Sequence, residues 1–124
     1  MSTHFIAKLN KCETAFHLLV LLSRSDGSSD NKEKKIILDF IENNFDEEMD
    51  LIKEQAFLTA LPPSEHEMHF EEIISHFYSL STEEERNKIV EFAMKVVMAD
   101  KQMTAGENRL IEQLFLAWDL NRSR

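Results

Sequence analysis

The chain has 124 residues, of which 43% are hydrophobic, with only 2 glycines and 2 prolines. This length fits one domain, residues 1–124, with enough apolar side chains to bury a core without disulfides or metal. The sequence has 14 basic and 23 acidic side chains, which gives a net charge of −9. This charge disfavours nucleic acid and anionic membranes as partners. It favours basic proteins and divalent cations.

Three features of the sequence bear on cellular location. Cys12 is the single cysteine, so no intrachain disulfide can form, which favours a reducing compartment. The N-terminal sequence MSTHFIAKLNK lacks the pattern of a signal peptide. The longest apolar run, Leu18–Leu22, is far shorter than the roughly 18 residues that cross a bilayer. We therefore expect a cytoplasmic protein without direct membrane insertion.

Helical periodicity accounts for the N-terminal half. The first predicted helix runs from about Phe5 to Arg24, and it is apolar on all sides over Leu18–Leu22, so we expect it to be central and buried. Asp30 is the expected cap of the second helix. A third helix, from about Glu47 to Ala60, ends before Pro62.

The C-terminal half predicts three more helices. The fourth runs from about Glu65 to Leu80, and Ser81 is the expected cap of the fifth, with Glu84 at the capping-box position. Thr104 is the expected cap of the sixth. No segment alternates as a strand does, so the predicted fold is all-α, a single domain of six to seven helices. The predicted buried stripes are Ile36, Ile37, Phe40 and Ile41; Leu51, Phe57, Leu58 and Leu61; Phe70, Ile73, Ile74 and Phe77; and Ile111, Leu114, Phe115 and Trp118.

The two ends of the chain repeat each other at an offset of 74 residues, because residues 16–41 align with residues 90–115. Asp26 falls on Asp100, and Glu33 falls on Glu107. The shared unit is an apolar helix, a loop that begins with Asp, and a second helix with Glu in its first turn. Two such helical hairpins can pack about a pseudo-two-fold axis and bury each other's apolar faces.

This repeated unit resembles the signature of the tellurite-resistance protein B (TerB-like) family. The residues that carry the resemblance are the Asp-Gly pair at Asp26, the Glu seven residues later in each copy, and the Trp-Asp-Leu ending at Trp118. The unit is also similar to the N-terminal region of a membrane-anchored DnaJ-like co-chaperone. The second copy departs from the pattern, since Lys101 stands where the first has Gly27.

The resemblance implies a divalent-cation site, with calcium the first choice, built from acidic residues of both loops. Carboxylates suit a hard cation, but Asp in a turn and Glu in a first helical turn also serve as caps, so both interpretations stay open. An EF-hand does not fit, because only seven residues separate Asp from Glu in each loop. The candidate ligands are Asp26, Glu33, Asp100 and Glu107.

Two weaker metal sites are conceivable on single helices. His69, Glu72 and His76, together with the nearby His66, would suit zinc, although that face is expected to be solvated because it lies opposite the apolar stripe. Glu13 and His17 have the spacing of a helical di-iron site, but the remaining ligands of such a site are missing. Cys12 lies on an apolar stripe and is expected in the core.

No nucleotide-binding or nucleophile motif occurs in the sequence. The leading hypothesis is a non-catalytic, TerB-like binding module that responds to a divalent cation in a tellurite-resistance-type stress response, with a protein as its partner. One alternative is a metal-independent protein–protein adaptor of co-chaperone-like type. Another is a helical metalloenzyme, which would need three or more converging ligands. The oligomeric state does not follow from the sequence.

Overall fold

The computed structural model describes residues 8–23, 31–45, 48–98 and 105–118, without the side chains at 31–33, 96–98 and 105–107. Within these ranges all regular structure is helical, which confirms the predicted all-α fold. No described helix has the length and hydropathy of a membrane span. The helices are α2 (Lys11–Ser23), α3 (Asn31–Asn44), α4 (Leu51–Ala60), the 3₁₀ turn η1 (Pro63–Glu65), α5 (His66–Leu80), α6 (Glu83–Met98) and α7 (Ala105–Ala117).

Helix α2 is the centre of the fold. Its residues from Thr14 to Ser23 are all buried, and it packs against each of the other five described α-helices. A helix that is apolar on every side is stable only where neighbours cover all of its faces. The predicted central position is therefore confirmed for α2, and Leu19 is fully buried.

Local caps place two helix starts later than the sequence predicts. Helix α2 starts at Lys11 rather than near Phe5, because Asn10 and Glu13 form a reciprocal capping box with distances of 2.8 and 2.9 Å. Helix α4 starts at Leu51 rather than Glu47, because the Asp50 carboxylate accepts the Lys53 backbone N–H at 3.2 Å.

The predicted cap of the fifth helix is shifted by one residue. Thr82 and Glu85 form its capping box, with distances of 2.9 and 3.2 Å between backbone nitrogens and side-chain oxygens. Ser81 instead closes the preceding helix, since its hydroxyl donates to the Phe77 carbonyl at 2.6 Å. The Ser81–Glu84 prediction was therefore wrong, because two S/T-x-x-E patterns overlap here and only the second fits the end of α5.

Most of the side chains in the predicted apolar stripes are buried in the structure. Ile36 is an exception: its side chain is 52% exposed while Ile37 is fully buried. Phe40 is half-buried and stacks on Phe92 of α6, with ring centroids 4.2 Å apart. The confirmed core positions of the predicted stripes are Ile37, Ile41, Leu58, Leu61, Phe70, Ile73, Ile74, Phe77, Ile111, Leu114 and Trp118.

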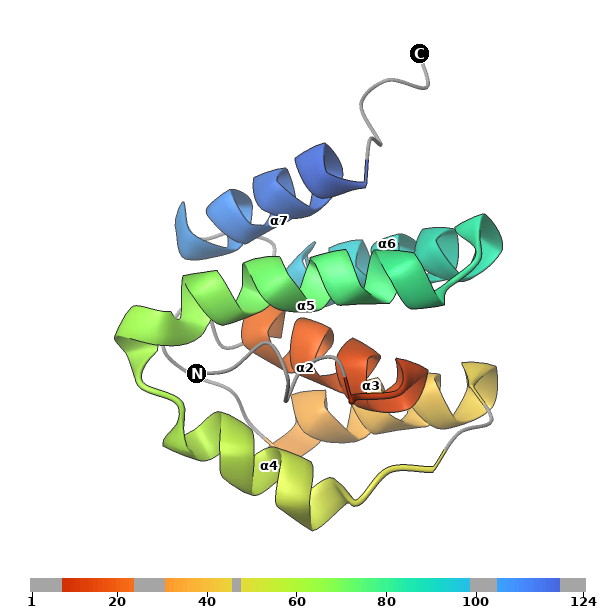
Figure 1. Cartoon of the computed structure of the whole chain (residues 1–124), viewed down its shortest axis with the longest axis vertical. Helices are drawn as coiled ribbons and strands as arrows, with labels where there is room; N and C mark the ends of the chain where they lie inside the picture. Colours follow the sequence, from red (N-terminus) through yellow and green to blue (C-terminus); the bar gives the residue numbers. More distant parts are fainter. Residues whose placement is uncertain (1–7, 24–30, 46–47, 99–104, 119–124) are drawn as a thin grey trace.

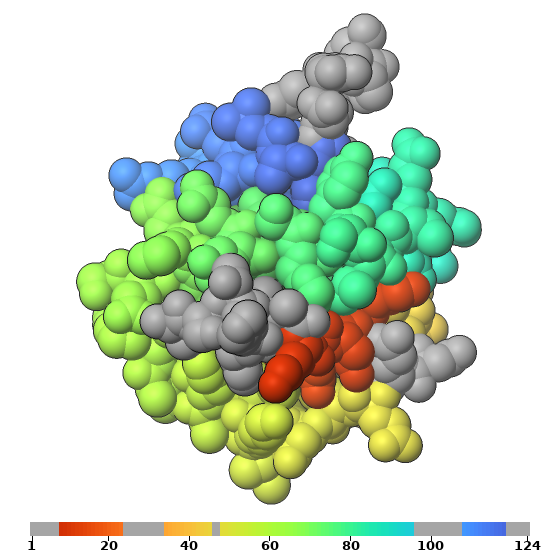
Figure 2. Space-filling view, viewed as in Figure 1, coloured from red at the N-terminus to blue at the C-terminus, as the bar shows by residue number. Residues whose placement is uncertain are grey.

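The helices form two hairpins joined by α4 and α5. In Figure 1, α2 and α6 both run from right to left, and α3 and α7 both run back from left to right. Lys11 and Glu85 link the first turns of α2 and α6 by an ion pair of 3.0 Å. Helix α5 lies against both α2 and α7, and the Trp118 indole N–H donates to the Ile74 carbonyl at 2.9 Å. Figure 2 looks onto α5, with α7 along one side of it and α4 at the opposite edge.

Candidate functional site

The four acidic residues of the predicted cation site are not covered by the described part of the structure. Asp26 lies in segment 24–30 and Asp100 in segment 99–104, both outside the described residues, and the side chains of Glu33 and Glu107 are outside them as well. The pseudo-symmetry of the two hairpins and the cation site both stay predictions. Within the described ranges, no three His, Cys, Asp or Glu side chains come together in a way that could hold a metal ion.

The predicted histidine face on α5 does not form. The Nε2 atom of His66 lies 3.2 Å from the Leu61 carbonyl, and that of His76 lies 3.0 Å from the Leu9 carbonyl. His69 points into the core and is only 3% exposed. The expectation of a solvated face was wrong at His69, because α2 and α4 cover that side of α5.

Three ionisable side chains from three helices meet in the core. His17 of α2 lies between the other two: its Nε2 is 2.7 Å from Glu54 Oε1 of α4, and its Nδ1 is 2.9 Å from His69 Nε2 of α5. All three side chains are at least 97% buried. Phe57 stacks on the His17 ring at 5.5 Å between centroids and closes the network from the α4 side. We call these three residues the buried triad.

Burial decides the charge of the outer histidine. Loss of hydration, followed by the positive charges that His17 and His66 can carry, lowers the pKa of His69 from 6.5 to about 4. His69 is therefore neutral at neutral pH. His17 Nε2 bonds to Glu54 Oε1 and His17 Nδ1 bonds to His69 Nε2, and the tautomers of the two rings decide which atom donates in each bond.

Each end of the triad keeps one buried polar atom without a hydrogen-bond partner among the described residues. These atoms are Glu54 Oε2 and His69 Nδ1. Beside His69, a shallow pocket lined by Leu61, Glu65, Met68, His69 and Glu72 has about 10 Å³ of room, which is enough for about one water molecule. The triad therefore joins α2, α4 and α5 through polar groups whose burial costs stability unless every bond is made.

The triad does not follow from the helical periodicity of the sequence, although the sequence contains a signal for it. His17 had been paired with Glu13, which instead caps α2 through Asn10, and Glu54 had not been singled out. His17 lies between Phe16 and the apolar run Leu18–Leu22, and a buried histidine needs a hydrogen-bond partner. Glu54 lies four residues before Leu58, so both occupy the buried face of α4. That spacing would have indicated a carboxylate facing the core.

The family of the chain is indicated by a match to a protein-family model. No curated protein and no solved structure matches the chain significantly. The family model described as Tellurite resistance protein TerB matches residues 13–123. This range runs from the first turn of α2 past the end of α7, and so includes both hairpins and the helices between them. The chain therefore belongs to the TerB tellurite-resistance family, as the repeated Asp-loop unit had predicted.

Proposed function

We propose that this TerB domain is a non-catalytic, cytoplasmic binding module of a tellurite-resistance-type stress response. A divalent cation, with calcium the first choice, would bind between Asp26, Glu33, Asp100 and Glu107, and a protein would be the partner of the domain. Hard cations of this kind take several oxygen ligands. Since each loop supplies only two of the four carboxylates, the site requires both loops at one end of the domain.

The direction of the described helices is the observation that supports this proposal. Helices α2 and α6 pack against each other and run in the same direction, with their first turns paired through Lys11 and Glu85. Helices α3 and α7 run back in the opposite direction. The C-terminal ends of α2 and α6 and the N-terminal ends of α3 and α7 therefore lie towards the same side, on the left in Figure 1. This arrangement of the described helix ends is the one that a site shared between residues 24–30 and 99–104 would need.

The charge of the chain supports the same proposal. If these four carboxylates converge in a domain of net charge −9, they would repel one another, and a bound cation would remove that repulsion. The cation would stabilise the folded state by mass action, by about 2.7 kcal/mol at a hundredfold excess over its dissociation constant. Magnesium would give less, because it keeps its own water ligands.

Thermal melting with calcium, magnesium or chelator tests the proposal. The test variant is Asp26→Asn/Asp100→Asn, and the matched control is Glu71→Gln/Glu91→Gln, which removes two exposed carboxylates from α5 and α6. We expect calcium to raise the Tm of wild type and control but not of the test variant. Equal shifts in all three would show nonspecific screening. No shift at millimolar calcium would refute the cation site and favour a metal-independent adaptor.

A further inference from the structure

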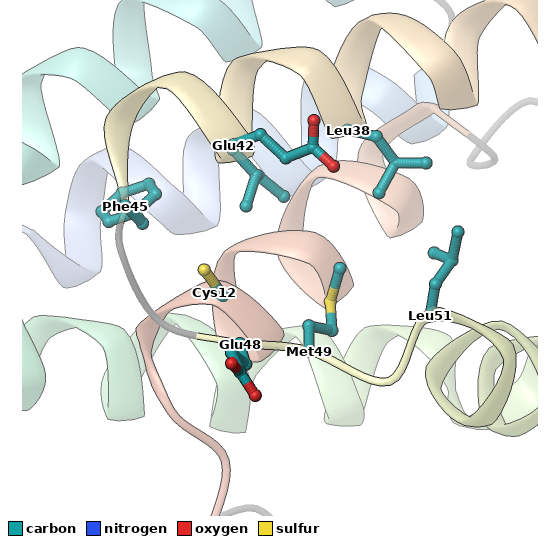
Figure 3. A pocket seen from close by; sticks show the side chains of 8 residues that line it. Cys12, Leu38, Glu42, Phe45, Glu48, Met49 and Leu51 are labelled. Carbon is teal, nitrogen blue, oxygen red and sulfur yellow. The ribbon is translucent and has the colours of Figure 1, made fainter.

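A second feature of the structure has the dimensions of a binding pocket. It lies between the first turn of α2, one face of α3 and the segment before α4, with a volume of about 380 Å³ (Figure 3). Ligand pockets typically measure about 300–1,000 Å³. We call it the α3 pocket; its lining residues are Cys12, Leu38, Ile41, Glu42, Phe45, Glu48, Met49 and Leu51.

The interior of the α3 pocket is apolar, and it rests on the core. Ile41 and Phe45 are buried, and the Phe45 ring meets Phe77 of α5 edge-on, with centroids 6.1 Å apart. Leu38 lies opposite Met49 and Leu51 across the opening (Figure 3), and all three are half-buried. An apolar side chain that enters this space removes its own surface and theirs from water.

The rim of the pocket is acidic. Glu42 and Glu48 are the two carboxylates among its lining residues, and both side chains are exposed. Neither forms an ion pair with any residue that the structure describes. The acidic character continues along the sequence, because residues 42–50 contain five Asp or Glu and no Lys or Arg.

The segment that carries one side of the rim is held in place. The Asn10 side-chain amide donates to the Glu48 carbonyl at 2.9 Å, and Asp50 caps α4 at Lys53. A rim fixed before binding loses little conformational entropy on complex formation.

We propose that the α3 pocket receives one large apolar side chain from a basic segment of a partner protein, whose flanking Lys or Arg side chains pair with Glu42 and Glu48. The apolar interior selects the inserted side chain, and the unpaired carboxylates select its positive neighbours. A polypeptide fits better than a small amphiphile because the negative charge extends along the chain beyond the pocket. The proposal names a partner class for the proposed binding role and does not depend on the cation.

The test uses a short fluorescein-labelled peptide in which lysine and leucine form an amphipathic helical pattern. Two reference peptides replace its leucines by serine or its lysines by glutamate. Binding is followed by fluorescence anisotropy and by methyl NMR of the full chain, in EDTA, so that failure of the cation site leaves this result unaffected. We expect only the lysine–leucine peptide to bind and to shift the methyl signals of Leu38, Met49 and Leu51. The Leu116 methyls, 72% exposed on α7, should stay unchanged.

Exposed variants separate the pocket from general charge attraction. Glu42→Lys/Glu48→Lys should weaken binding about tenfold or more, whereas Glu71→Lys/Glu91→Lys, with the same change of net charge, should weaken it less than about threefold. Equal losses in both variants would overturn the proposal, and so would equal binding of the serine or glutamate peptide. Saturation of the pocket methyls by dodecyltrimethylammonium, with no response to the lysine–leucine peptide, would instead mark a small-molecule site.

Discussion

The buried triad makes the stability of the domain depend on pH through His69. The relevant comparison is between wild type and His69→Gln, which keeps a hydrogen-bonding group beside His17 but cannot take up a proton. In the folded protein the pKa of His69 is lowered from 6.5 to about 4. In the unfolded chain the same imidazole is hydrated and titrates near 6.5.

The direction of the effect follows from proton binding. Between pH 6.5 and 4 the unfolded chain holds the His69 proton while the folded chain does not, so acid favours unfolding. The part of the unfolding free energy that depends on neutral His69 is fully present above pH 6.5. It falls as the pH drops through this window and changes no further below about 4. Lowering a pKa from 6.5 to about 4 corresponds to about 3 kcal/mol at 1.36 kcal/mol for each pKa unit.

Urea unfolding, followed by circular dichroism at several pH values between 7.5 and 4, measures this contribution. We expect wild type to lose about 3 kcal/mol more unfolding free energy than His69→Gln over that range. The carboxylates common to both proteins cancel in the difference. His76→Gln is the matched control, because His76 bonds to the Leu9 carbonyl outside the triad, and it should keep the wild-type slope. Identical slopes for wild type and His69→Gln would refute the reasoning, as would an NMR titration that places the His69 pKa near 6.5.

Two further predictions concern the core and a helix start. Leu114→Ala should lower the unfolding free energy by about 2–5 kcal/mol, since Leu114 is fully buried; the control Leu116→Ala, at a position 72% exposed, should change it by less than about 0.5 kcal/mol. A loss below about 1 kcal/mol at Leu114 in denaturant melts would contradict its core position. Thr82→Ala should cost about 1 kcal/mol as a lost cap, whereas Glu84→Ala should cost almost nothing; the reverse order would restore the Ser81–Glu84 cap.

Much of the fold could be predicted from the sequence, because helix formation depends on interactions between residues close together in the chain. Periodicity over one or two turns predicted the helical class and the buried stripes, because a helix repeats its faces every 3.6 residues. The wholly apolar stretch within α2 required a central position, and Pro62 required a break after α4. The repeated Asp-loop unit indicated the TerB family, which the match over residues 13–123 confirms. Helix starts were less certain, since competing caps such as Ser81 and Thr82 differ only in how the preceding helix ends.

The buried triad and the α3 pocket are each formed by several elements of the chain, so only the tertiary structure reveals them. His17 meets partners 37 and 52 residues away in the sequence, and periodicity within one helix cannot tell which residue of another helix lies opposite. The same limit explains Ile36, because both it and Ile37 suit an apolar stripe and only the rotation of α3 against α2 decides which is buried. The α3 pocket depends on how segment 48–51 passes α3. The sequence determines each helix and its apolar face, whereas the angles and rotations between helices are set by side-chain packing across the whole core, which decides which polar groups are buried together.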